Sequence, residues 1–135
     1  MKFTLDTYAW IEYFEGSSIG AGVKVVIEQE DCELFTPSVV LAELSDAVVK
    51  GKIKQDWQDL ARFVTFNTQI QEIDAELARD AGIIKNDLRK KHPDFGLIDA
   101  IVLATARKTN SKLLTGDAHL VGEPNVIDIR KNHIV

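Results

Sequence analysis

The chain has 135 residues, of which 45% are hydrophobic and 27% are charged, with three prolines and eight glycines. This composition excludes disordered and fibrous proteins and predicts a single domain over residues 1–135 that buries about two-thirds of its unfolded surface. Sixteen basic against 21 acidic residues give a net charge of −5, whereas proteins that bind nucleic acid usually present a basic face.

The first part of the chain alternates between strand-like and helical patterns. The expected elements are a strand over 2–5, a helix over 8–14, a helix over 19–30 and a strand over 33–36. Thr36-Pro37-Ser38 is typical of a helix start, with a hydroxyl cap at Thr36 followed by Pro37, and this helix is expected to end at Gly51.

The second part continues the alternation. We expect a helix around 57–64, a strand over 69–73, a helix from Asp74 to about Lys91, a helix over 97–106 and strands over 113–115 and 126–129. Alternating strands and helices predict a parallel sheet with helices on both faces. The expected fold is therefore α/β, a three-layer α/β/α sandwich with a central parallel sheet of about five strands.

Two acids follow predicted strands. Asp6 comes after the first strand, and Asp117 comes after the strand that ends at Thr115. Ligand sites of open parallel sheets lie beyond the carboxyl ends of the strands, so both acids are candidates for such a site. Each also has a plain structural interpretation, Asp6 as a helix cap and Asp117 as a turn residue.

Two more acids interrupt apolar helical runs. Glu43 shares a helical face with apolar neighbours, and Asp99 lies within a nearly continuous apolar stretch, where Gly96 or Asp94 is better placed to begin the helix. A partly buried carboxylate needs a hydrogen-bond partner, a cation or a metal. Asp46, one turn after Glu43, is a competing candidate.

The four acids together favour divalent metal ions, because converging carboxylates repel one another. Oxygen ligands select Mg²⁺ or Mn²⁺, and two such ions can hydrolyse a phosphodiester. Of the 21 acidic residues, 17 remain outside this site against 16 basic ones, so the net charge is only weak evidence against a nucleic-acid partner. Thr7 and Thr115 could position a water or a ligand nearby.

These residues and their order resemble the PIN domain family, specifically the small VapC-type toxin ribonucleases of bacterial and archaeal toxin–antitoxin pairs. The resemblance spans nearly the whole chain. The matching segments are Leu5-Asp6-Thr7, Leu41-Ala42-Glu43-Leu44, Leu97-Ile98-Asp99-Ala100-Ile101 and Leu114-Thr115-Gly116-Asp117.

The resemblance implies a metal-dependent endoribonuclease that cleaves single-stranded segments of RNA. It implies that Asp6, Glu43, Asp99 and Asp117 are catalytic acids that bind Mg²⁺ or Mn²⁺, and that Thr115 supports them. It also implies a homodimer that is silenced by a cognate antitoxin protein, whose tail enters the active-site groove.

Partner surfaces and RNA contacts have weaker sequence signals. The early helices that carry Trp10, Phe14 and Trp57 are expected to expose apolar side chains to such partners. The basic run 89–92 is a candidate RNA contact, although most charge runs are solvated faces. His119, where the family often has an acid or a basic-polar pair, is interpreted as a surface residue.

Alternative functions remain open. Within the same fold, the chain could be a housekeeping RNA-processing nuclease or a non-catalytic RNA- or protein-binding module. An aspartyl-phosphate phosphatase is disfavoured because Tyr8, two residues after Asp6, stands where a second acid is usual. A phospho-accepting receiver domain is disfavoured because no phosphoacceptor follows the third strand.

The predicted location is the cytoplasm. Cys32 is the only cysteine, so an intramolecular disulfide is excluded. The first residues lack the uninterrupted apolar run of a signal peptide, and no stretch reaches the roughly 18 apolar residues of a membrane span.

Overall fold

The computed structural model describes residues 1–131 of the chain, so the last four residues of the predicted domain lie outside the described part. The strands are β1 (Lys2–Leu5), β2 (Glu33–Pro37), β3 (Gln69–Gln71), β4 (Lys112–Thr115) and β5 (Val126–Asp128). The helices are α1 (Thr7–Glu15), α2 (Ser18–Glu28), α3 (Ser38–Val49), α4 (Trp57–Asn67), α5 (Ala75–Leu88) and α6 (Leu97–Thr109).

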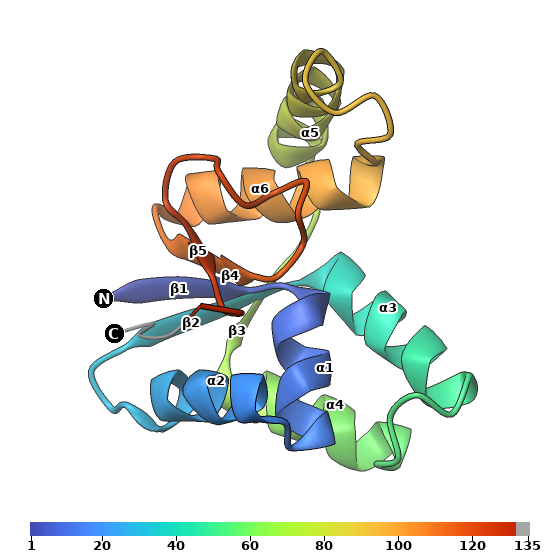
Figure 1. The fold of residues 1–135 in the computed structure, drawn as a ribbon, viewed down its shortest axis with the longest axis vertical. Helices are drawn as coiled ribbons and strands as arrows, with labels where there is room; N and C mark the ends of the chain where they lie inside the picture. Colours follow the sequence, from blue (N-terminus) through green and yellow to red (C-terminus); the bar gives the residue numbers. More distant parts are fainter. Residues whose placement is uncertain (132–135) are drawn as a thin grey trace.

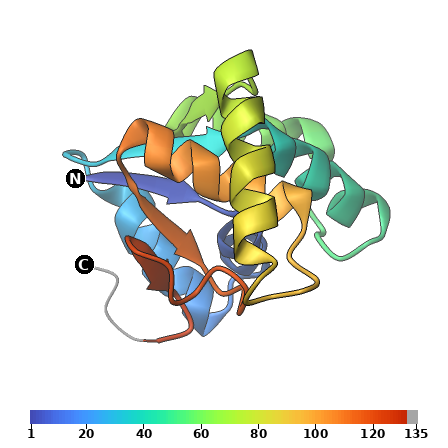
Figure 2. The same cartoon turned by 90° about the horizontal axis from the view of Figure 1, so that it is seen from above.

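The five strands form one parallel sheet in the order β3-β2-β1-β4-β5. α5 and α6 pack together over one face, and α1, α2 and α4 lie across the other, as Figure 1 and Figure 2 show. α3 leaves the carboxyl end of β2 and packs against α1, α4 and α6. The predicted three-layer α/β/α sandwich is therefore confirmed. Its strand order differs from the 2-1-3-4-5 order of receiver domains, which removes that alternative.

The helix starts agree with the sequence pattern in one case and not in another. Asp74 caps α5 as predicted, because its carboxylate accepts a backbone hydrogen bond from the first turn (2.8 Å). The predicted Thr36 cap of α3 is wrong, since Pro37 occupies the cap position without a side-chain hydrogen bond. The Thr36 hydroxyl instead accepts a hydrogen bond from the Trp10 indole (3.2 Å) and bonds to the Thr68 hydroxyl (2.8 Å).

An aromatic cluster lies between α1 and α4. Trp10 is fully buried there, so the expectation that it would be exposed to a partner is wrong. Its ring stacks on Phe14 at 5.6 Å and meets Tyr13 and Phe63 edge-on at 5.9 and 6.2 Å. Phe14 and Trp57 are half-buried. These three side chains of the early helices therefore contribute mainly to the core.

None of the helices within residues 1–131 combines the length and the apolar composition that a membrane crossing requires.

α1 and α2 approach most closely at Gly20. A Cβ atom at this position would lie 2.1 Å from the carbonyl oxygen of Glu12 and 2.6 Å from its carbonyl carbon. The same test at Gly82, within α5, meets no atom within 4 Å. Only glycine therefore fits the contact between the first two helices.

We expect Gly20→Ala to lower the free energy of unfolding by about 1–3 kcal/mol, because the added methyl forces the two helices apart. Gly82→Ala is the matched control and should raise it by about 0.5–1 kcal/mol, because alanine loses less backbone freedom in a helix. Urea unfolding followed by circular dichroism measures both. Equal stability of Gly20→Ala and the wild type would show that α1 and α2 separate without cost.

Candidate active site

Four acids come from four elements that meet at the carboxyl edge of the sheet. β1 and β4 are neighbours, and Asp6 follows β1 directly while Asp117 comes two residues after β4. Glu43 belongs to α3, and Asp99 lies in the first turn of α6, after its cap residue Gly96, as predicted. In Figure 1 this edge lies between the start of α1, the start of α3 and the start of α6.

Two threonines connect three of these acids. The Thr115 hydroxyl donates to Asp6 Oδ2 (2.6 Å) and accepts from the backbone N–H of Asp117 (3.0 Å). The Thr7 hydroxyl donates to Glu43 Oε1 (2.5 Å), while its backbone N–H donates to Asp6 Oδ1 (2.7 Å). Both threonine hydroxyls thus donate to carboxylates and position them, where the sequence had suggested contact with a water or ligand.

Asp6 and Asp117 also have the local structural roles considered above. Asp6 caps α1 through its bond to the first helical N–H. Asp117 accepts a hydrogen bond from the backbone N–H of His119 (2.8 Å), which closes a turn after β4. These bonds orient the two side chains, so the structural and the chemical interpretations are compatible.

Gly116 allows the start of α1 to lie against the end of β4. A Cβ atom at this position would come within 2.4 Å of the Tyr8 ring. The ring therefore packs directly on the backbone of Gly116. This contact holds the segments that carry Asp6 and Asp117 close together.

Two of the acids resist ionisation. Burial raises the pKa of Asp6 to about 7, against the hydrogen bonds from Thr115 and Thr7, and the charges of Asp99 and Glu43 raise it further. Burial and the charge of Asp117 raise the pKa of Asp99 to about 6, and Glu43 adds to the effect while His119 opposes it. The charges of Asp99 and Glu43 thus act on Asp6, and those of Asp117 and Glu43 act on Asp99.

Basic side chains of the protein do little to offset the negative charge of the four acids. Within residues 1–131, no lysine or arginine forms an ion pair with any of the four acids, and His119 is the one basic side chain within 4.0 Å of Asp99 and Asp117. Asp46, the competing candidate, is exposed and pairs with Lys50 at 2.8 Å instead.

His119 is the site residue whose place the sequence pattern missed. Its side chain is 31% exposed and lies against the acids, where a surface position had been expected. One ligand atom each from Asp99, Asp117 and His119 lie within 4.8 Å of one another, so these three residues could hold a metal ion. A single histidine in a loop gives no periodic signal, and only the two-residue spacing from Asp117 pointed to it.

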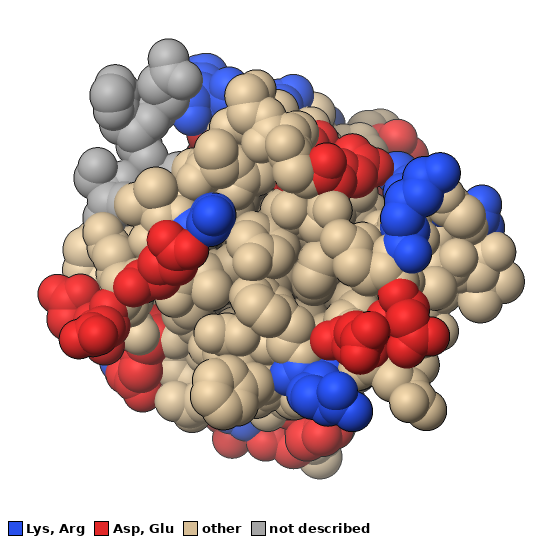
Figure 3. Space-filling model, turned by 90° about the horizontal axis from the view of Figure 1, so that it is seen from below, with Lys and Arg blue, Asp and Glu red and all other residues tan. Residues whose placement is uncertain are grey.

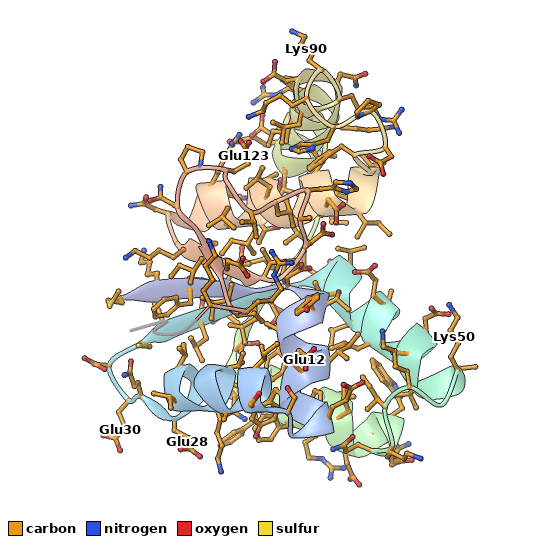
Figure 4. The ribbon with its side chains drawn as sticks, in the orientation of Figure 1. Glu12, Glu28, Glu30, Lys50, Lys90 and Glu123 are labelled. Atoms are coloured by element: carbon orange, nitrogen blue, oxygen red, sulfur yellow. The ribbon has the colours of Figure 1, made fainter. Side chains whose placement is uncertain are left out.

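A groove of about 530 Å³ opens beside Thr7 and Glu43 and follows α3. Ile98 contributes an apolar wall, and Lys50 and Lys52 line the other end. Figure 4 shows Lys50 at the far end of α3. The groove therefore leads from Glu43 past Asp46 to basic side chains.

The basic run 89–92 contributes to local structure. Arg89 donates to the backbone carbonyl of Phe95 (2.8 Å), and Lys91 pairs with Glu123 (3.1 Å). Lys90 pairs with Asp87 at the exposed end of α5. The contact of the run 89–92 with RNA stays a prediction.

Residues 3–121 match the sequence model of the PIN domain. No curated protein is similar enough in sequence to match the chain.

Solved structures resemble the whole chain at low sequence identity. One is VapBC2 from Rickettsia felis bound to a fragment of its promoter DNA, with a TM-score of 0.72, 22% identity and coverage of 94% of this chain and 96% of that one. Another is VapBC-1 from nontypeable Haemophilus influenzae, with a TM-score of 0.71, 18% identity and coverage of 97% and 100%.

A third is VapC20 from Mycobacterium tuberculosis, described as a toxin that cleaves the sarcin–ricin loop. It has a TM-score of 0.66, 18% identity and coverage of 86% of this chain and 90% of that one. The neighbours agree in fold with the domain match, which extends from β1 to beyond the Asp117 turn. The chain therefore belongs to the PIN domain family.

Proposed function

We propose that this protein is a Mg²⁺- or Mn²⁺-dependent endoribonuclease, a hydrolase of RNA phosphodiester bonds that acts as the toxin of a toxin–antitoxin pair in the cytoplasm. The observation that carries the proposal is the cluster of Asp6, Glu43, Asp99 and Asp117 at the sheet edge. Membership in the PIN domain family and the likeness to VapC toxins support it.

The donor set fits a divalent ion. Asp6 and Asp99 have raised pKa values because they are buried near other acids, and a cation of charge +2 would stabilise their ionised forms. Carboxylate oxygens are the ligands that Mg²⁺ and Mn²⁺ take in proteins. Asp6, Glu43, Asp99 and Asp117 are the residues that would hold such ions.

The chain's own groups supply the positioning that hydrolysis needs. Thr7 and Thr115 fix the carboxylates of Asp6 and Glu43, so that their arrangement does not have to form during the reaction. The groove beside Glu43 offers a path for a single RNA strand, with Lys50 and Lys52 available to its phosphates. A bound divalent ion would add the activation of water and the neutralisation of charge on the phosphate.

The substrate class follows from the groove and from one neighbour. VapC20 is described as cleaving the sarcin–ricin loop, which is a structured RNA. An open groove suits a strand presented by a loop rather than a regular duplex. We therefore propose a loop of a structured RNA as the substrate.

The antitoxin surface is proposed on the face formed by α1, α2 and α4. In Figure 3 the centre of this face is free of charged residues, which lie mostly around its rim. Val25 of α2 is 52% exposed and Phe66 of α4 is 87% exposed. Apolar surface with a charged rim is typical of protein interfaces. A neighbour described as a toxin–antitoxin complex supports a protein partner for this chain.

The metal proposal makes a prediction about pH and stability. In EDTA, the wild type should become less stable as pH rises from about 4 to 7, because burial raises the pKa of Asp6 in the folded protein to about 7 from an ordinary value of 3.8. The share of the loss that is due to Asp6 is at most about 4 kcal/mol, and Asp6→Asn should remove this share and leave that of Asp99. Saturating Mn²⁺ should restore the stability at pH 7.

Urea unfolding across this pH range measures the difference between the wild type and Asp6→Asn. The control is Asp46→Asn, an exposed acid on α3 that should follow the wild-type curve. A gain in the stability of the wild type relative to Asp6→Asn between pH 4 and 7 would contradict the raised pKa of Asp6.

The catalytic prediction concerns Asp99. Purified protein should cleave structured RNA with Mg²⁺ or Mn²⁺, leaving a 5′-phosphate and a 3′-hydroxyl, and EDTA should stop the reaction. Asp99→Asn should slow cleavage by about 10³-fold or more, because it removes a carboxylate that would hold the divalent ion, and this ion would activate water and neutralise the developing charge. Asp59→Asn, at an exposed acid of α4 outside the groove, is the matched control. The rates are measured on gels with end-labelled RNA.

Equal cleavage by Asp99→Asn and the wild type would point to another active centre or a contaminating nuclease. An active enzyme whose native host yields no partner protein would favour the housekeeping nuclease. If the wild type bound RNA without cleaving any, the binding module would become the better interpretation.

The partner prediction uses two exposed apolar residues on opposite faces. Light scattering should give the mass of two chains, and affinity purification from the native host should recover a small antitoxin.

Phe66→Glu should weaken antitoxin binding at least 10-fold, because it places a charge in an apolar contact, while RNA cleavage stays unchanged. Ile83→Glu, on the opposite face at 61% exposure, is the control. Equal loss in both variants would contradict the assigned surface.

A further inference from the structure

His119 has two different neighbours for its two ring nitrogens. Nδ1 lies 4.0 Å from Asp99 Oδ2 and 3.8 Å from Asp117 Oδ1. Nε2 lies 3.2 Å from Asp94 Oδ1, on the loop that precedes α6. One side of the imidazole therefore faces the acid cluster, and the other faces a carboxylate outside it.

Asp94 lies on the side of the ring that faces away from the acid cluster. Its Oδ1 atom is within ion-pair distance of Nε2, and a carboxylate in this place favours a hydrogen on Nε2. Nδ1, the nitrogen nearer to Asp99 and Asp117, is then the ring atom available to a metal ion. A carboxylate that orients a histidine in this way is a recurrent feature of metal sites in proteins.

The ring is also held by packing. It lies beside His92, with ring centroids 5.5 Å apart, and beside the fully buried Phe95 at 6.4 Å. Its own backbone N–H donates to Asp117 Oδ1 (2.8 Å), which links the histidine to one of the acids. Contacts from two loops thus fix the direction in which Nδ1 points.

The three donor atoms of Asp99, Asp117 and His119 are close enough to share an ion. They lie within 4.8 Å of one another. Donors bound to one ion at about 2.1 Å are at most about 4.2 Å apart, so only small side-chain movements are needed.

We infer that His119, oriented by Asp94, is a nitrogen ligand of the divalent ion at Asp99 and Asp117, and that it shifts the preference of the site from Mg²⁺ towards Mn²⁺. Imidazole suits transition metals, whereas Mg²⁺ favours oxygen donors. This inference rests on the proposed function in so far as both require a metal ion at this edge of the sheet. It adds a fifth protein ligand and a choice of ion to the four carboxylates.

The first test is spectroscopic and independent of RNA cleavage. Pulsed electron paramagnetic resonance of the protein loaded with Mn²⁺ should show coupling to a directly bonded ¹⁴N nucleus. His119→Asn should abolish this signal, because its amide oxygen can take the place of Nδ1 as a donor. His92→Asn should keep the signal, since that ring touches His119 without facing the acids.

The second test is the affinity for each metal, measured by calorimetric titration of MnCl₂ and MgCl₂. His119→Asn should weaken Mn²⁺ binding at least 10-fold and Mg²⁺ binding much less, so that the ratio of the two affinities falls. Asp94→Ala should weaken Mn²⁺ binding by about 10-fold, as losses of orienting carboxylates do at other metal sites. The exposed Asp87, replaced by alanine, is the control on a neighbouring segment.

Several results would overturn the inference. Bound Mn²⁺ without ¹⁴N coupling would exclude His119 as a ligand while leaving the nuclease proposal intact. Tighter Mn²⁺ binding in His119→Asn would show that the histidine acts as a competing cation. No binding of either ion would end both proposals, whereas ¹⁴N coupling in a protein that cleaves no RNA would uphold the inference and end only the nuclease.

Discussion

Carboxylates that stand close together repel, and Asp6, at 6% exposure, has little water to weaken that repulsion. The fold holds the carboxylates of Asp6 and Glu43 in place with hydrogen bonds from Thr7 and Thr115, and the backbone N–H of Asp117 donates to the Thr115 hydroxyl. Hydrogen bonds fix the direction of a carboxylate without cancelling its charge. The acids therefore remain available to an added cation, at a cost that appears as raised pKa values.

The topology of the sheet makes this arrangement rigid. β1 pairs with both β2 and β4, so Asp6 lies in the middle of the edge where the other acids arrive. The loop that carries Asp117 and His119 is fixed at its other end by Glu123. This side chain is 9% exposed and pairs with Lys91 at 3.1 Å and with Arg107 at 3.5 Å, and Figure 4 shows it beside α6. Ion pairs away from the acids thus support the position of the site.

Hydrophobic periodicity was enough to predict the order of the elements, because each helix or strand buries one stripe or face. Glu43 and Asp99 were recognisable because a charge within an apolar helix is costly unless something compensates for it. The strand order was not predictable, since it depends on which strands pair in space. The Thr36 cap failed for a similar reason, because a tertiary contact with Trp10, 26 residues away, competes for the hydroxyl.

Residues that act through contacts between loops were the hardest to find. His119 meets Asp94 across two separate turns, and neither residue belongs to a periodic pattern. The buried position of Trp10 was missed because the helical spacing of α1 does not tell which of its apolar residues faces the sheet. The carboxylates could thus be named from the sequence, while the groups that orient them required coordinates.

The sheet ends on both sides in very short strands. β3 and β5 have three residues each, whereas the inner strands have four or five. A strand of three residues offers few backbone groups to a second chain, and short edges are one way in which β-proteins avoid growing into fibres. Association through continued β-pairing is therefore disfavoured, and the surfaces left for assembly are those of the helices. A helical surface presents side chains rather than a backbone template, so it can discriminate among proteins by their sequence.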